Sequence, residues 1–511
     1  MFKTIKNDIP ASIVVFFVAL PLCLGIALAS GAPLFSGLIA GIVGGIVVGA
    51  ISGSKIGVSG PAAGLAAIVL SSIATLGGFE NFLVAVVIGG VFQIVLGFLK
   101  AGVIGYYFPS SVIKGMLTGI GIIIIMKQIP FFFGYDKSVE SFSMDAISIG
   151  STVIGIISIG ILLLWQQVLT KKSKIFQLIQ GPLVAVVVGI LFFVLTQGNE
   201  QLAINVKQLV SVPVPDSIDT FLGQFTFPNF GVIGNKDVWI TAFTIAIVAS
   251  LETLLCVEAT DKLDPDKNVT PTNRELLAQG AGNIVSGLIG GLPVTQVIVR
   301  SSANIQSGGK SKMSAIIHGF FLLISIILIP TLLNKIPLSV LAAVLFIVGF
   351  KLAKPSTFIN MYKLGWKQFI PFMATVLPMV ITGDLLLGIG LGLAVGIVVI
   401  LFKSYQNSHF LHIEDKSNGV HKIKMTLAEE VTFFNKGAIL KELDKLPENT
   451  YLELDVRKTR YLDNDIIEIL EDFAFKAKER NIDIKLYSER GIVENPSSFI
   501  DFFKLRPNKA A

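Results

Sequence analysis

The sequence is poor in charged residues, cysteine and histidine, and each shortage excludes a class of protein. Asp, Glu, Lys and Arg make up only 15% of the 511 residues, whereas soluble domains carry about 25%. Both cysteines, Cys23 and Cys256, lie in apolar runs, which favours packing over a disulfide. The four histidines are scattered, and no metal-ligand spacing occurs. A soluble domain, a disulfide scaffold and a metalloprotein are therefore not expected.

Motifs of enzymes and of nucleic-acid-binding proteins are also lacking. The C-terminal part contains neither a glycine-rich phosphate loop nor a nucleophile motif, so an enzyme is the least expected function. The net charge of +6 is better explained by lysines in the loops on one side of a membrane than by a nucleic-acid partner.

Long apolar runs are abundant instead. The uncharged run 11–54 is far longer than the roughly 20 residues that a helix needs to cross a bilayer. The runs are continuous rather than alternating, which excludes a β-barrel. The first run lacks the short core and small-residue cleavage site of a signal peptide, so it is predicted to be a membrane span. The chain is predicted to be a polytopic α-helical membrane protein.

The apolar runs predict fourteen membrane elements, seven on each side of the polar stretch 197–236. The third element of each half is broken, at Gly60-Pro61 in the first half and at Arg300-Ser301 in the second. Seven elements per half give the halves opposite orientations, which is the arrangement of inverted-repeat transporters, with repeats at about 8–196 and 237–405. The elements are expected at 9–30, 33–51, 57–76, 82–99, 110–128, 147–169, 178–195, 238–260, 276–292, 292–306, 313–333, 337–352, 369–382 and 385–402.

The loop charges predict the orientation of the chain. With the N-terminus in the cytoplasm, the cytoplasmic loops hold most of the cations, which is the positive-inside pattern. The other side holds only a few, including Lys137, Lys207 and Lys335. Both termini are therefore predicted to be cytoplasmic. The cations on the cytoplasmic side are Lys55, Lys100, Lys171, Lys172, Lys174, Lys262, Lys267, Arg274, Lys310, Lys312, Lys351, Lys354, Lys363, Lys367 and Lys403.

The two broken elements are the best candidates for a binding site. Residues 58–64 read VSGPAAG and residues 292–306 read LPVTQVIVRSSANIQ, and in each a short extended run gives way to helix-compatible sequence. Helix N-termini present unpaired N–H groups and partial positive charge. Two such termini facing each other near the membrane midplane, at Ala62 to Gly64 and at Arg300 to Ser301, would hold a small anion.

Arg300 is expected to follow the β-favouring run 294–299 and to precede a helix. An arginine is costly to bury in a membrane, so attraction of an anion would explain its presence there. The polar residues Thr295 and Gln296 in the same broken segment support this interpretation. The alternative is that Arg300 lies at the cytoplasmic boundary and extends its side chain into water.

Glu252 lies inside the eighth predicted span, where a carboxylate indicates a functional site by default. It could take up a proton, bind sodium or balance Arg300, and the alternative is a structural hydrogen bond between helices. Cys256 follows one turn later on the same face, although packing is the simpler explanation for it. Glu252, Cys256 and Thr295 are the candidate residues for a coupling ion or proton.

The composition changes near residue 409. Strand-like runs at 421–426, 451–456 and 482–487 alternate with amphipathic helices at 437–446 and 465–480. This pattern predicts a small soluble α/β domain at 409–511, after a transmembrane transport domain at 1–408.

Several motifs in order resemble those of the sulfate permease family of anion transporters with a C-terminal STAS domain. They are ALPLCLGIALASG at 19–31, VSGPAAGLA at 58–66, FPSSVIKGMLTGIG at 108–121, SLETLLCVEATDKL at 250–263, and the long run from Asn273 to Gly319. The resemblance covers essentially the whole chain. It implies seven plus seven inverted repeats divided into a core and a gate domain, and a homodimer.

The resemblance also implies roles for individual residues. The anion would sit between the third and tenth elements, near Gly60, Pro61, Ala62 and Ala63 and near Val299, Arg300 and Ser301, while Glu252 would serve coupling. Bicarbonate transporters of this family bind sodium through an aspartate and a threonine one turn apart on the eighth span. Glu252 and Cys256 occupy those positions here, and a thiol is a poor ligand for a hard cation.

A secondary active transporter in a bacterial inner membrane is therefore expected, with bicarbonate as the first choice of substrate and sulfate or a small dicarboxylate as the next. No cofactor is expected beyond a coupling sodium ion or proton. The rival hypotheses are an anion channel and a membrane-anchored scaffold that acts through its STAS domain. The stretch 461–465 lacks the serine or threonine that is phosphorylated in related domains, so a phosphoswitch is not expected there.

Overall fold

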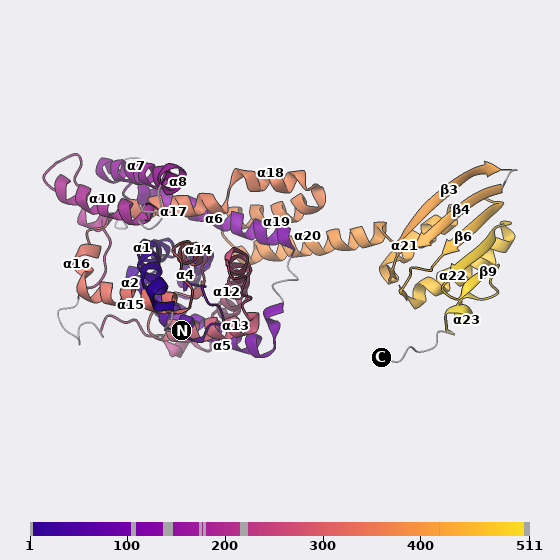
Figure 1. Cartoon of the computed structure of the whole chain (residues 1–511), viewed down its shortest axis with the longest axis horizontal. Helices are drawn as coiled ribbons and strands as arrows, with labels where there is room; N and C mark the ends of the chain where they lie inside the picture. The colour runs from indigo at the N-terminus through magenta and orange to yellow at the C-terminus, as the bar shows by residue number, and fades with distance from the viewer. Residues whose placement is uncertain are drawn as a thin grey trace. The chain divides into compact units, whose positions relative to one another are not determined.

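The computed structural model describes residues 4–103, 109–135, 147–172, 176, 180–214, 223–417 and 420–504 (Figure 1). The chain folds into two compact units, a membrane unit of Met1–Leu393 and a C-terminal unit of Ala394–Ala511. The predicted end of the transport domain, residue 408, lies just beyond the helix in which the two units meet.

The first half of the membrane unit contains the seven predicted elements in order. The third of these is a three-residue strand followed by a short helix, as its Gly-Pro turn predicts. The elements are α1 (Ile5–Ala29), α2 (Leu34–Val43) continued by η2 (Gly44–Val48) and α3 (Gly49–Ile51), β1 (Ser59–Pro61), η3 (Ala63–Leu65), α4 (Ala66–Thr75), α5 (Phe79–Phe98), α6 (Ser110–Phe132), α7 (Ile149–Leu164) continued by η6 (Trp165–Leu169) and α8 (Thr170–Lys172), and α10 (Gly181–Thr196).

The second half repeats this order after two short turns, η7 (Val206–Gln208) and η8 (Phe230–Val232). Its helices and strand are α12 (Lys236–Leu263), α13 (Thr272–Leu288), β2 (Val294–Gln296), α14 (Ile298–Gln306), α15 (Met313–Leu328), α16 (Pro330–Leu333), α17 (Leu338–Leu352), α18 (Pro355–Lys363), α19 (Trp366–Thr382) and α20 (Leu385–Gln406). Among the described residues, eight helices are long and apolar enough to cross a membrane, and three further apolar helices are shorter. The prediction of a polytopic helical membrane fold is confirmed.

The second broken element differs from the prediction in its detail. The strand β2 ends at Gln296 instead of continuing to Val299, and Arg300 lies in the first turn of α14 instead of before it. The β-branched side chains favour a strand, but only three residues find a partner in β1. The Val297 N–H donates to Val58 O, and the Ser301 N–H donates to Val297 O and begins the helix.

The two broken elements meet at the centre of the membrane unit. The strands β1 and β2 pair antiparallel, with Ser59 opposite Gln296, Gly60 opposite Thr295 and Pro61 opposite Val294. Figure 1 shows α1, α4 and α14 close together with α12 beside them, and of these helices α1 contacts β1 and α12 contacts β2. Because each strand ends where a half-helix begins, the pairing holds the two helix starts near each other.

The C-terminal unit is a five-stranded mixed sheet with helices on one face. The strand order is β3-β4-β6-β8-β9, in which β4, β6 and β8 are parallel to one another. Buried side chains from these strands pack against α21 and α22, which cover that face. The elements are β3 (His409–Ser417), β4 (Val420–Leu427), β5 (Glu430–Val431), η9 (Phe433–Asn435), α21 (Lys436–Asp444), β6 (Thr450–Asp455), β7 (Tyr461–Leu462), α22 (Asn464–Glu479), β8 (Asp483–Ser488), β9 (Gly491–Glu494) and α23 (Phe499–Lys504).

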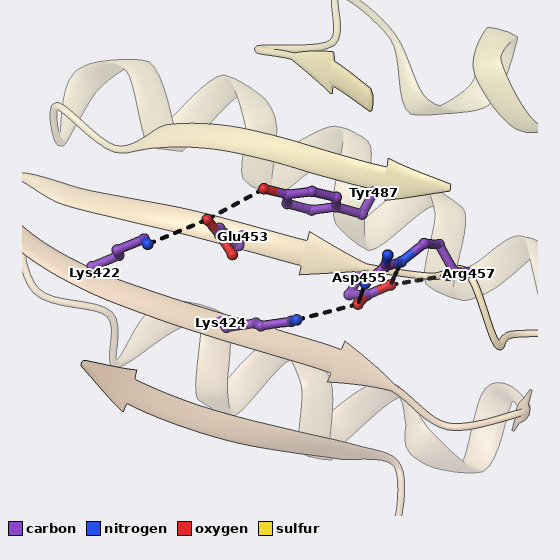
Figure 2. A network of polar contacts seen from close by, with 6 residues as sticks. All are labelled: Lys422, Lys424, Glu453, Asp455, Arg457 and Tyr487. Carbon is purple, nitrogen blue, oxygen red and sulfur yellow. Dashed lines mark hydrogen bonds and ion pairs between the residues drawn. The ribbon is translucent and has the colours of Figure 1, made fainter. Parts of the chain in front are cut away.

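The other face of this sheet carries paired charges, as Figure 2 shows. Asp455 is the best connected of them: Arg457 Nη2 lies 2.6 Å and Nε 2.9 Å from its two oxygens. Lys424 Nζ lies 3.5 Å from the same carboxylate. On the neighbouring pair, Lys422 Nζ lies 3.7 Å from Glu453 Oε1.

The Asp455 pair predicts a pH-dependent stability of the C-terminal unit. The hydrogen bonds from Arg457 lower the pKa of Asp455 from 3.8 to about 2. A carboxyl group whose pKa is lowered in the folded state stabilises that state at any pH above the pKa of the unfolded chain. This stabilisation is lost as the pH falls from about 4 to about 2. We expect Asp455→Asn to cost about 1–2 kcal/mol at neutral pH and almost nothing near pH 2, as measured by urea unfolding of residues 409–511.

The matched control is Asp465→Asn. Asp465 lies 3.6 Å from Lys436 Nζ with both side chains about half exposed, so its loss should be small at either pH. An equal cost of Asp455→Asn at both pH values would contradict the prediction.

Candidate functional site

One face of α12 touches the starts of both half-helices. The carboxylate of Glu252 accepts a hydrogen bond from the N–H of Gly64, at the beginning of the helix that runs through η3 and α4. One turn later, the Cys256 sulfur accepts a hydrogen bond from the N–H of Ile298, the first residue of α14. The two residues that the sequence singled out on this span therefore lie at the two positive helix ends.

The glycine at position 64 allows this close approach. A Cβ atom added there would lie 2.6 Å from Glu252 Oε2, closer than two such atoms pack. The same Oε2 atom is buried and has no hydrogen-bond partner among the residues that the structure describes. One oxygen of a buried carboxylate is thus left available for a proton or a ligand.

A cavity of about 160 Å³ lies against these groups. Its wall is apolar except at Glu252 and Cys256, so a charged group bound there would be screened from water. Of the predicted anion-site residues, Ala63 and Val299 line it. The lining residues are Leu22 and Ile26 of α1; Ala63 and Gly64 of η3; Leu117 and Ile120 of α6; Glu252, Leu255, Cys256 and Ala259 of α12; Val297, Ile298 and Val299 at the start of α14; and Leu345, Val348 and Leu352 of α17.

Arg300 does not line this cavity. Its side chain is fully buried, with Nη2 3.2 Å from the sulfur of Cys23. The guanidinium also lies against Gly60, so closely that a Cβ atom at Gly60 would overlap Nη1. The guanidinium therefore contacts Cys23 of α1 and Gly60 of β1, neither of which lines the cavity. The alternative that Arg300 extends its side chain into water does not fit this burial. The role of Arg300 in anion binding stays a prediction.

The other predicted residues of the broken elements have structural contacts. Ser301 Oγ accepts the N–H of Val58 at 3.0 Å and donates to Val297 O at 2.9 Å, which ties the two broken elements together. Thr295 is buried opposite Gly60, and its hydroxyl has no partner among the described residues. Gly60, Pro61 and Ala62 are buried and do not line the cavity.

The sequence did not lead us to predict a row of buried polar side chains on α13, which we call the polar ladder. Glu275, Gln279 and Asn283 are fully buried at four-residue spacing, so they share one helix face. Gln279 Nε2 donates to Ser59 Oγ of β1 at 2.8 Å. Asn283 accepts the N–H of Val294 of β2 at 2.6 Å and donates to its carbonyl at 3.1 Å. This ladder fixes both strands, and its spacing was visible in the sequence.

An open recess of about 510 Å³ adjoins the cavity. The two share Leu22, Val299 and Val348 in their walls, so the recess leads toward Glu252. It opens at the end of the membrane unit where α14 and α17 finish, and Lys351 is the charged residue in its wall.

Known proteins share the sequence pattern of this chain. The model of the sulfate permease family matches residues 5–375. The chain is 25% identical to the putative sulfate transporter YvdB of Bacillus subtilis, over 93% of this chain and 90% of YvdB. It is 26% identical to the bicarbonate transporter BicA of a Picosynechococcus strain, over 84% of this chain and 76% of BicA.

A solved structure agrees with these relatives. The transmembrane domain of a cyanobacterial bicarbonate transporter BicA superimposes with a TM-score of 0.65 at 25% identity, covering 76% of this chain and 98% of that domain. These similar proteins are transporters and not enzymes, as the sequence predicted. The matched region includes both broken elements, α12 and the cavity between them, and from this agreement of pattern and fold we conclude that the chain belongs to the sulfate permease family.

Proposed function

We propose that the protein is a secondary active transporter of a small inorganic oxyanion, with bicarbonate as the substrate, and that it works by alternating access. The central cavity carries this proposal. Two half-helix starts and one carboxylate converge on a space of about 160 Å³. The N–H groups of Gly64 and Ile298 are held by Glu252 and Cys256, but the positive helix dipoles at such starts still attract an anion without an adjacent lysine or arginine.

The charge of the cavity favours a monoanion. Glu252 lies in the same wall as the two helix starts, and a like charge at close range costs more for a dianion than for a monoanion. Arg300 lies outside the cavity wall, against Gly60 of β1, and adds to the positive potential near the site. Bicarbonate carries a single charge near neutral pH, whereas sulfate and dicarboxylates carry two. Sulfate remains the second candidate, because a relative of comparable identity is named a sulfate transporter.

Glu252 is the proposed coupling group. Glu252 lines the cavity, one of its carboxylate oxygens has no hydrogen-bond partner among the described residues, and the carboxylate accepts the N–H of Gly64. Protonation would remove the repulsion between Glu252 and the anion, which couples proton and anion binding. Cys256 supplies a sulfur where a sodium site needs an oxygen, and this favours a proton over sodium at Glu252.

The proposed cycle moves one group of helices against another. The cavity lies between α1, α12 and the half-helices on one side and α6 and α17 on the other, which we assign to the core and the gate. The recess at Lys351 gives access from one side, and the loop cations favour a cytoplasmic position for this side. We place the protein in a bacterial inner membrane as a homodimer, with both termini in the cytoplasm and residues 409–511 as a STAS domain.

The proposal is tested by transport into proteoliposomes. Purified protein should accumulate radiolabelled bicarbonate under an imposed proton gradient, above the level of protein-free vesicles, which report the diffusion of CO₂. Radiolabelled sulfate should accumulate less. If neither anion accumulates under a proton or a sodium gradient, the proposed substrate class is wrong.

The channel and scaffold alternatives give different results in the same system. Slow, saturable flux supports a transporter, whereas large unitary currents in planar bilayers would indicate a channel. Deletion of residues 409–511 should leave part of the uptake in place, whereas a scaffold would lose all its function.

A further inference from the structure

One surface of the membrane unit combines lysines with exposed aromatic side chains. It lies on the short helix α18 and the turns on either side of it, between the end of α17 and the start of α19. The nine residues of α18 give a length of about 14 Å, far too short to cross a bilayer. Because α17 and α19 correspond to predicted membrane spans, this surface is expected at the level of the lipid headgroups.

One face of α18 is fixed to α19. Met361 is buried in a cluster with Phe372 and Val376 of α19. The ring centre of Phe358 lies 5.2 Å from that of Phe372, edge to face. Figure 1 shows the two helices side by side. The opposite face of α18 therefore points away from α19.

This outward face is apolar and aromatic. Ile359 and Tyr362 of α18 are both more than half exposed, and so are Leu364 and Trp366 in the turn that follows. Tyrosine and tryptophan concentrate at membrane–water interfaces, where an apolar ring with one polar group meets both acyl chains and headgroups. A helix with such a face lies against lipid.

The lysines of this surface have no acidic partner. Residues 276–383 contain neither Asp nor Glu. Lys354 precedes the first residue of α18 and Lys363 is its last residue, and both are exposed. Neither forms an ion pair with any residue that the structure describes. The surface is therefore positively charged as well as apolar.

This combination of charge and apolar area discriminates between possible occupants. A second copy of the same surface would bring lysines against lysines, because a two-fold interface joins identical patches. A zwitterionic lipid would cover the apolar side chains, but it carries a cation of its own. An anionic phospholipid covers the apolar side chains and also neutralises the lysines.

We propose that α18 and its flanking turns form a binding surface for anionic phospholipid. Lys354 and Lys363 bind the headgroups, and Tyr362 and Trp366 lie among the glycerol groups and the first carbons of the acyl chains. The preceding helix α17 contributes three residues to the wall of the central cavity, so lipid bound here would hold the end of a helix that lines it. An effect on transport rests on the proposed function, whereas lipid binding does not, and the two are tested separately.

The test is quenching of tryptophan fluorescence by brominated lipids. The chain has three tryptophans, so Trp165→Phe combined with Trp239→Phe leaves only Trp366. This full-length protein is placed in vesicles of equal parts phosphatidylcholine and phosphatidylglycerol, with one or the other lipid brominated. Brominated phosphatidylglycerol should quench more, and we expect about a fivefold preference, the effect of one lysine near an anionic surface. High salt should reduce this preference.

Substitutions test the lysines in the same single-tryptophan protein. Lys354→Gln combined with Lys363→Gln should remove the preference, whereas arginine at both positions should keep it. The matched control is Lys171→Gln combined with Lys172→Gln, two exposed lysines at the end of α8, and it should keep the preference. If the first glutamine variant does not fold, the salt dependence decides.

Equal quenching by the two lipids in the protein with its lysines intact overturns the proposal, and so does a preference that survives both the glutamine variant and high salt. Loss of a dimer in the glutamine variant, without any lipid preference beforehand, would make this surface a contact between copies. Where anion uptake occurs, its rate should rise with the fraction of phosphatidylglycerol. A lipid preference without any uptake would leave the surface intact and refute the proposed function.

Discussion

Replacement of Glu252 by glutamine abolishes gradient-driven anion accumulation. Glutamine keeps the size of the side chain and can still accept the N–H of Gly64, but it cannot exchange a proton or balance a cation. The cavity should keep its shape, because the other wall residues do not change. We expect uptake under a proton gradient to fall to the level of protein-free vesicles, whereas exchange of labelled for unlabelled anion without a gradient persists.

The control for this variant is Glu258→Gln on the same helix. Glu258 is exposed and pairs with Lys262 at 2.5 Å, away from the central cavity. It should transport as the unchanged protein does, since surface ion pairs contribute little. Unchanged gradient-driven uptake in Glu252→Gln would make Glu252 a structural residue and remove it from the coupling mechanism.

The fourteen membrane elements follow from the sequence because hydropathy and helix length determine where a chain can cross a bilayer. The broken elements were visible for a similar reason: Gly60-Pro61 and the β-branched run after Pro293 both disfavour a continuous helix. The amphipathic helix α18 was missed because it is short and only moderately apolar. The edge strand β3 was missed because its sequence, HFLHIEDKS, does not alternate.

The candidate site was predicted less completely than the fold. Residues on one face of one helix, such as Glu252 and Cys256, follow from helical spacing alone. The position of the Arg300 guanidinium does not follow from the sequence, because it lies against Gly60 of β1, a strand remote in the sequence that pairs with β2. The polar ladder of α13 had a helical signal in Glu275, Gln279 and Asn283, yet its partners lie on strands remote in the sequence.

Gly60 contacts the guanidinium of Arg300 and lies just before the start of the first half-helix. A methyl group at Gly60 would overlap the guanidinium, which is fully buried and also contacts Cys23. Either β1 or Arg300 must therefore move, and overpacking of this kind costs about 1–3 kcal/mol. Movement of β1 would shift the start of the first half-helix, and movement of Arg300 would shift the start of the second. We expect Gly60→Ala to lower the rate of anion uptake by about tenfold or more at equal protein.

A second substitution separates lost space from lost stability. Cys23→Ala removes the sulfur on the other side of the guanidinium, so it gives Arg300 room to move away from the added methyl. The double variant should recover part of the uptake that Gly60→Ala loses. Gly160→Ala on α7 is the control, because a Cβ atom there meets nothing within 4 Å. Full uptake in Gly60→Ala would show that transport does not depend on the contact between Arg300 and β1. Arg300 would then have no role in the anion site.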